Sequence, residues 1–456
     1  MAIRQTLKRI LCGDDANTIF TYSRRIRKFL FAPHSPELRS LDLSWLQVLA
    51  SSHSLLPRLD EVRSKSNALS QELMLLMHIM GDSLTKFSFL APTTSYRSIL
   101  DALAQKSQGL HSLDLSTVVH WVLTDSENIG DKMCTVLRGA QNLRDLHISA
   151  GVRDEVWSAV MQLPRLRALS MSSFRPYTSS PGSESTFIVA SLTSLHVRVP
   201  TYVVFDDILK ACTFPSLESL SATFYFSKPP GHDDMSALVD AIVRSCSPDK
   251  LQSLRLLSLS GTNGSERVDY VRPDALRPLC RFSRMRHFQL RTRWYWNLDD
   301  TCLLDIARAW PELRELELDP VGFWYRPARV TLSGLVPLAV HCPQLESFGI
   351  LLGESTAPDT HGTSSCAPNT MLRHLSIGHA TIEDHQCTSV ATFLSQLFPN
   401  LQHVDYPSGS FPHPFHSDGA EAPRTYRERW RRVSDQVASF ALQSASTEDC
   451  RASIRQ

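Results

Sequence analysis

The chain has 456 residues, of which 42% are hydrophobic, so it is long enough for several globular domains or for one elongated repeat domain. It carries 47 Lys and Arg against 46 Asp and Glu, and this net charge of +1 excludes the strongly positive surface typical of nucleic-acid-binding proteins and of polybasic membrane anchors. We therefore expect a target protein as the partner, with neither nucleic acid nor membrane.

Residues 1–50 are predicted to form an N-terminal helical segment that includes one or two degenerate repeats. The stretches 22–31 (YSRRIRKFLF) and 38–50 (LRSLDLSWLQVLA) have apolar residues at repeat-like spacing, and the second is the part expected to be helical. The first 20 residues lack an apolar core of signal-peptide length, and no stretch of about 18 residues is apolar throughout. A cytoplasmic or nuclear location is therefore expected.

From Leu59 onward a short pattern, L-x-x-L-x-L with conservative replacements, recurs along the chain. Weaker copies begin at Leu59 and Leu84. Clear copies begin at Leu110, Leu143, Leu166, Leu192, Leu217, Leu251, Met285, Leu313, Leu345, Leu372 and Leu401. Their mean spacing of about 28 residues is that of leucine-rich repeats. The pattern predicts a solenoid of about 13 units over residues 51–410.

Each repeat is predicted to contain one strand and one helix. The last apolar positions of a copy alternate with polar ones, so that Leu316 and Leu318 should point inward from a short strand. Helical spacing precedes later copies at 95–108, 153–164, 204–215, 234–248, 300–311, 333–343 and 389–399. The predicted fold class is α/β, a right-handed leucine-rich-repeat solenoid with a curved parallel sheet and helices on the outer face.

The ten cysteines show no C-x-x-C pairs, which favours reduced thiols over disulfides or zinc ligands. Cys212, Cys246 and Cys280 each lie five residues before the first position of a repeat. This regular placement predicts a small buried apolar position rather than a reactive thiol.

Four insertions rich in Gly, Pro, Ser and Thr follow predicted strands, at 174–188, 260–268, 353–370 and 407–425. We expect them to be loops on one edge of the sheet. His413 and His416 lie in the last of these without an acidic or Cys partner at fixed spacing, so no metal site is expected there.

The C-terminal part is predicted to close the array. Residues 411–445 are expected to form a loop and a capping helix, and residues 446–456 a flexible tail. The apolar stripe of the helix comprises Trp430, Val433, Val437, Phe440 and Ala441.

Polar strand positions supply the first set of candidate partner-binding residues, because the outward face of a parallel repeat sheet is the usual binding surface. Alternation places the following side chains there: Asp145, His147, His196, Arg198, His287, Gln289, Arg291, Glu315, Glu317, Asp319, His374 and His403. Those taken as candidates are His196, Arg198, His287, Arg291, Glu315 and Glu317. For any single position, an ordinary solvated strand residue is the alternative.

Two aromatic triplets supply the second set of candidates. They follow consecutive repeats at similar distances, and consist of Trp294, Tyr295 and Trp296 and of Phe323, Trp324 and Tyr325. Because successive repeats stack, we expect the two triplets to lie side by side, and Trp and Tyr are enriched in interface hot spots. The alternative is that the rings pack two loops onto the solenoid and contact no partner.

The repeats, with the stretches FTYSRRIRKFLF, HSLLPRLDEV and VHCPQLESF and the W-x-x-V-x-x-x-V from Trp430, resemble the large fungal families of F-box proteins with ribonuclease-inhibitor-like repeats. This resemblance covers nearly the whole chain. It implies the substrate-recognition part of a ubiquitin-ligase receptor, with a ligase adaptor as a further partner if an F-box exists upstream.

The chain departs from these families at its start, where the first 20 residues contain no L-P-x-E-type F-box. Either the adaptor-binding end is missing, or the repeats form a stand-alone interaction scaffold without a ubiquitin connection. Regulation of a small GTPase is a more remote alternative. We find no G-x-S-x-G, phosphate-loop, H-E-x-x-H or dinucleotide motif, and therefore expect neither catalytic residues nor a cofactor.

Overall fold

The computed structural model divides the chain into two compact units, Met1–Gly182 and Ser183–Gln456. The division falls inside the insertion predicted at 174–188. The described residues are 24–31, 56–64, 82–91, 93–117, 126–151, 154–172, 187–225, 229–259, 269–292, 294–321, 323–324, 328–353, 357, 367–378, 380–406 and 423–454.

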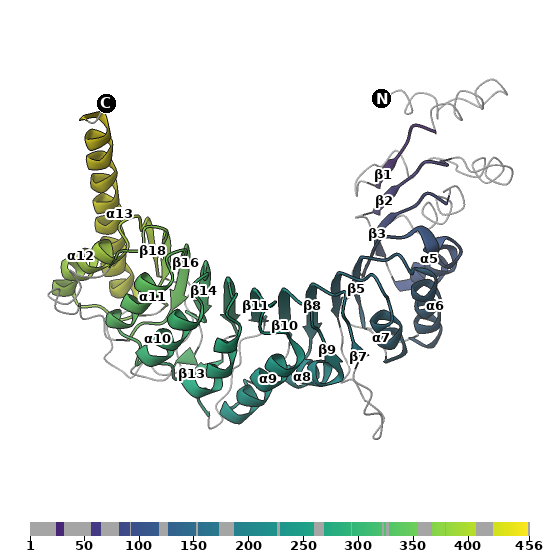
Figure 1. Ribbon diagram of the computed structural model, residues 1–456, viewed down its shortest axis with the longest axis horizontal. Coiled ribbons are helices and arrows are strands. Elements are labelled where there is room, and N and C mark those ends of the chain that lie inside the picture. The colour runs from purple at the N-terminus through teal and green to yellow at the C-terminus, as the bar shows by residue number, and fades with distance from the viewer. Residues whose placement is uncertain are drawn as a thin grey trace. The chain divides into compact units, whose positions relative to one another are not determined.

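The first unit is built on parallel strands that pair in chain order. These are β1 (Lys28–Phe31), β2 (Glu61–Ser64), β3 (Lys86–Ala91), β4 (Ser112–Thr117), β5 (Asp145–Gly151) and β6 (Ala168–Ser172). Helices α5 (Thr93–Lys106), α6 (Ser126–Gly139) and α7 (Asp154–Met161) lie on one side of these strands (Figure 1). The stretch 22–31 therefore does contribute a strand to the array, while 38–50 lies outside the described residues.

The second unit repeats this arrangement with a longer series of parallel strands. They are β8 (Ser194–Val199), β10 (Ser219–Phe224), β11 (Ser253–Ser258), β12 (His287–Arg291), β14 (Glu315–Leu318), β16 (Ser347–Ile350), β17 (His374–Ser376) and β18 (His403–Asp405). Their helices are α8 (Tyr202–Ala211), α9 (His232–Ser245), α10 (Asp300–Ala309), α11 (Val336–His341) and α12 (Cys387–Leu397). The α/β class is thus confirmed.

One hydrogen-bond pattern sets the register between neighbouring repeats. The carbonyl oxygen just before a strand accepts two N–H groups from the next repeat. Thr193 O accepts from Glu218 N at 2.8 Å and Ser219 N at 3.0 Å, and Glu218 O accepts from Gln252 N at 2.8 Å and Ser253 N at 2.9 Å. The same pair of bonds recurs between neighbouring copies within each unit, two residues before the first inward apolar residue, so equivalent residues stand side by side.

The inward positions of the second unit form a continuous apolar row at equivalent register. Its members are all buried: Leu195, Leu220, Leu254, Phe288, Leu316, Phe348, Leu375 and Val404. Leu316 and Leu318 point inward as predicted. Burial of such a row gives the unit its stability, because no single repeat can cover its own leucines.

Each of the seven predicted helical ranges overlaps a helix; no helix was predicted for α6 or between β11 and β12. There the chain forms two 3-10 helices, η2 (Pro273–Ala275) and η3 (Arg277–Arg281). Pro278 lies near the middle of this stretch and cannot donate the backbone hydrogen bond that an α-helix requires. No helix within the described residues is long and apolar enough to cross a membrane.

The buried cysteine position is confirmed at Cys212 and Cys246, whereas Cys280 is half-buried. Burial raises the pKa of the Cys246 thiol to about 12 and that of Cys280 to about 11. No cysteine among the described residues forms a disulfide bond. A thiol so rarely ionised at neutral pH is a packing group and not a nucleophile.

The C-terminal helix α13 (Pro423–Ile454) closes the second unit beside α12 and β18 (Figure 1). It is longer than predicted and continues through most of residues 446–456, where a tail was expected; this segment has neither Gly nor Pro to end a helix. Trp430, Val433 and Val437 are buried as predicted, but Phe440 and Ala441 are only half-buried because the covered stripe ends before them.

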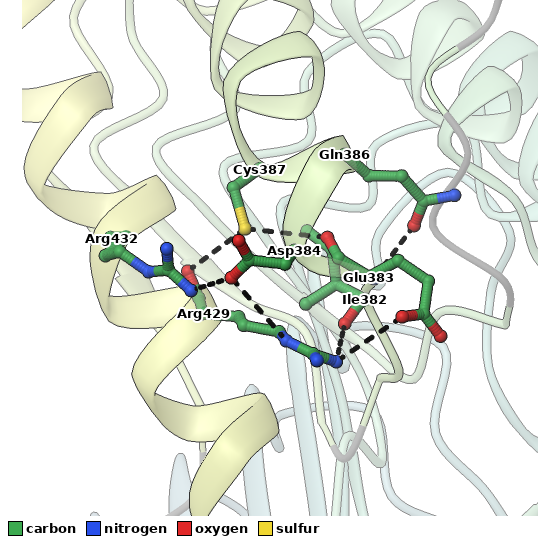
Figure 2. A network of polar contacts seen from close by, with 7 residues as sticks. All are labelled: Ile382, Glu383, Asp384, Gln386, Cys387, Arg429 and Arg432. Carbon is green, nitrogen blue, oxygen red and sulfur yellow. Dashed lines mark hydrogen bonds and ion pairs between the residues drawn. The ribbon is translucent and has the colours of Figure 1, made fainter.

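Polar contacts fix α13 against the short helix η6 (Asp384–Gln386), as Figure 2 shows. Arg429 is buried, and its Nη1 donates to Ile382 O at 2.8 Å and lies 3.7 Å from Glu383 Oε2. Arg432 forms an ion pair with Asp384 that lowers the pKa of this carboxyl. The side chains of Arg429 and Arg432 therefore hold α13 against η6 and are not available to a ligand.

Candidate functional site

The outward positions of β8, β10, β11, β12 and β14 form a surface that we call the polar face. Its side chains are Ser194, His196, Arg198, Ser219, Ser221, Thr223, Ser253, Arg255, Leu257, His287, Gln289, Arg291, Glu315 and Glu317. All lie within the second unit, and most are half-buried or exposed. Six of them were predicted as candidate partner-binding residues, and the parallel register brings these together on one face.

Glu317 is the best-anchored charge of the polar face. Its side chain is 12% exposed, and its Oε2 accepts a hydrogen bond from Gln289 Nε2 at 2.7 Å. Arg291, on the same neighbouring strand, donates Nε to Glu317 Oε1, and this contact raises the pKa of Arg291. Gly349 of β16 leaves room for the acid, since a Cβ there would lie 3.2 Å from Glu317 Cγ. Arg291 and Glu317 thus form an ion pair with each other.

Glu315 joins the cationic side chains of two other strands. Its Oε2 lies 3.6 Å from Arg255 Nη2 and 3.5 Å from His287 Nδ1. Both distances are longer than an ordinary hydrogen bond, and the three side chains are 31% to 43% exposed. Water therefore screens this cluster, and its contribution to stability is small.

Arg198 and His196 interact at the opposite side of the polar face, on β8. Arg198 Nε donates to His196 Nε2 at 3.3 Å, a geometry that requires an unprotonated Nε2. Within the described residues Arg198 has no carboxylate partner. Its guanidinium charge is consequently not neutralised by a neighbouring acid.

The first aromatic triplet is not on the surface, which corrects its candidate role as a binding patch. Trp294 and Trp296 are 1% and 0% exposed, and Tyr295 is also buried. Trp294 packs against Phe224 and Tyr202, with ring centroids 5.5 and 6.4 Å apart. These rings pack their loop onto the solenoid, which was the alternative to a binding patch.

The two triplets do lie side by side, as predicted. Tyr295 and Trp296 form the short strand β13, which pairs in parallel with β15, formed by Phe323 and Trp324. The side chains of Phe323 and Trp324, and the whole of Tyr325, lie outside the described part of the chain. Backbone pairing therefore joins the two loops into a small second sheet.

Asp319 holds this second sheet in place. Alternation predicted an outward position, but Asp319 is fully buried and has a positive φ of 47°, which turns its side chain inward. Its Oδ2 accepts from Thr292 Oγ1 at 3.0 Å, Trp296 Nε1 at 2.9 Å and Trp294 N at 3.3 Å. The carboxylate therefore fixes the loop that carries the triplet.

Sequence reasoning missed Arg255, although the alternation of the copy from Leu251 places it outward between His196 and His287. It also missed the structural role of Asp319, since nothing in the residue type announces a left-handed backbone. No group of three or more His, Cys, Asp or Glu within the described ranges is arranged to hold a metal ion, and the 413–416 stretch lies outside those ranges.

Comparison with known proteins gives no family assignment. A scan against protein-family models finds no match, and a search of curated proteins finds no similar relative.

Proposed function

We propose that the chain is a right-handed leucine-rich-repeat module whose polar face binds a partner protein, as the substrate-recognition part of an F-box receptor does. The observation that carries the proposal is the in-register parallel ladder of the second unit, which aligns outward side chains of five neighbouring strands on one face. The repeat spacing and the stretches that resemble the repeat part of fungal F-box proteins also support it.

The chemistry of the polar face favours binding over catalysis. Its acids are engaged by Arg and Gln side chains. A mixed surface of Arg, His, Ser and Glu is typical of the polar part of protein interfaces, where such groups supply orientation and specificity.

Site-specific photo-crosslinking tests which face is used. A benzophenone amino acid introduced at Ser221 or Ser253 of the polar face should form a discrete covalent adduct with a partner protein in living cells. The matched control positions, Ala237 and Asp240, are exposed on α9 and should give no such adduct.

Circular dichroism of each variant excludes a folding defect as the cause of a negative result. Adducts that arise only from the α9 positions, or from neither face, would contradict the proposal. Adducts with an adaptor of a ubiquitin ligase from other positions would add the ligase connection without changing the assignment of the face.

A further inference from the structure

Charge is distributed unevenly across the polar face. The four neighbouring strands β8, β10, β11 and β12 have twelve outward positions, and none of these is Asp or Glu. They comprise three Arg, two His, five Ser or Thr, one Gln and one Leu, namely Arg198, Arg255, Arg291, His196, His287, Ser194, Ser219, Ser221, Ser253, Thr223, Gln289 and Leu257. The acids begin only at β14, with Glu315 and Glu317.

Two of the three Arg side chains keep hydrogen-bond donors for a ligand. Arg198 donates to His196 and has no carboxylate partner among the described residues. Arg255 has Glu315 as its acidic neighbour, 3.6 Å from its Nη2; its Nε is buried, and because the side chain is 43% exposed, its Nη groups are the donors that face a ligand. Arg291, by contrast, is occupied by Glu317.

Short hydroxyl side chains lie between these two guanidinium groups. Strand β10 separates β8 from β11 and contributes Ser221, which is level with Arg255 and half-buried, and Thr223, which is level with Arg198 and buried. Within the described structure neither hydroxyl hydrogen bonds to a protein atom. Adjacent strands are about 4.8 Å apart, so β8 and β11 are separated by about 10 Å. Arg198 and Arg255 are offset by two residues along these strands, and the hydroxyl groups of β10 lie between them.

We infer that this basic part of the polar face, β8 to β12, binds an acidic segment of the partner protein, with carboxylates on Arg198 and Arg255. Guanidinium groups and hydroxyls both donate to carboxylate oxygens, and charge-assisted contacts of this kind are stronger than neutral ones. Glu315 and Glu317 repel the same segment and so define the side on which it ends. The inference rests on the proposed function and names the class of partner sequence.

Fluorescence anisotropy with a defined probe tests the inference. A fluorescein-labelled peptide of four Glu-Ser repeats should bind the full chain at low ionic strength, and the same peptide with Gln for Glu should not. The double variant Arg198→Gln/Arg255→Gln should weaken binding at least about tenfold, the loss expected for two charge-assisted contacts.

A matched variant keeps the same net charge as the double variant. Arg244→Gln/Arg308→Gln removes two exposed Arg of α9 and α10 and should change the affinity by less than about twofold, the effect of long-range charge alone. A charge reversal, Arg198→Glu/Arg255→Glu, should bind a Lys-Ser peptide instead. This gain cannot come from misfolding.

Three results would overturn the inference: no binding of the Glu-Ser peptide, equal binding by the double variant, or tighter binding of a phosphoserine peptide, single-stranded RNA or phosphatidylserine vesicles. The proposed function fails separately. If crosslinks arise from Ser221 or Ser253 while the acidic peptide does not bind, the polar face still binds a partner, but not through an acidic segment.

Discussion

At the scale of single residues, Asp319 decides where the loops after β12 and β14 go. One carboxylate oxygen accepts hydrogen bonds from a hydroxyl, an indole and two backbone N–H groups, all within the buried interior. A left-handed backbone is tolerated by Asp and Asn better than by other residues with a Cβ. The same residue therefore supplies both the turn and the acceptor.

We predict that Asp319→Ala lowers the free energy of unfolding by about 3–5 kcal/mol, because buried donors lose their acceptor and Ala is strained at positive φ. Asp319→Asn keeps an acceptor and the backbone preference, and should lose about 1–2 kcal/mol. Urea denaturation followed by Trp fluorescence measures both. Equal losses in the two variants would show that the carboxylate is not the anchor of Trp294 and Trp296.

Sequence reasoning at this scale succeeded for side chains whose position follows from alternation, such as Leu316 and Arg291, and failed for Asp319. Alternation assumes an extended backbone, and a single left-handed residue reverses the direction of the next side chain. The aromatic triplets were also not predictable from residue type. Trp and Tyr are enriched both in protein cores and in interfaces, so their presence does not distinguish a buried ring from a partner-binding one.

At the scale of elements, α13 protects the last strand of the second unit. Trp430 Nε1 donates to Ala380 O at 3.0 Å, and Ser434 Oγ accepts from Val404 N at 3.1 Å, so the helix supplies a hydrogen bond that β18 cannot obtain from a further strand. A covered edge is also shielded from pairing with another chain.

We predict that Trp430→Ala costs about 3–5 kcal/mol of local stability and exposes β18. Hydrogen exchange at the amide of Val404 should accelerate in this variant and remain unchanged in Arg431→Ala, whose side chain is exposed on α13. Unchanged protection of β18 in Trp430→Ala would contradict the capping role.

The ion pair of Arg432 with Asp384 adds a pH dependence to this cap. Arg432 lowers the pKa of Asp384. The ion pair therefore stabilises the packing of α13 on η6 fully above the ordinary Asp pKa of about 3.9, and this stabilisation is lost as the pH falls through the lowered pKa. Both side chains are more than half exposed, so solvent screening keeps the effect small.

The strands of the two parallel series, from β2 onward, were predictable because L-x-x-L-x-L fixes both the start and the phase of each strand. The short strands β13 and β15 lie outside this pattern. Helices with regular apolar spacing and no internal Pro, such as α9 and α10, were predictable for the same reason. The length of α13 was not, because it depends on contacts between segments that a local pattern does not contain.

At the scale of the whole molecule, every functional statement depends on the strands of the second unit being parallel, in chain order and in register. Only then do Ser194, Arg255, His374 and His403 share one face. In such a ladder, the distance between equivalent residues of two strands increases by about 4.8 Å for each additional strand between them.

Spin-label distance measurements in the full chain test this most directly. One label replaces Ser194 and the second replaces Ser347, His374 or His403, in a background with Cys12, Cys280, Cys366 and Cys450 changed to Ser; the remaining thiols are buried. We predict three distances that increase in this order by about 4–5 Å per strand. Distances that stay constant or decrease along the series would contradict the ladder and, with it, the polar face.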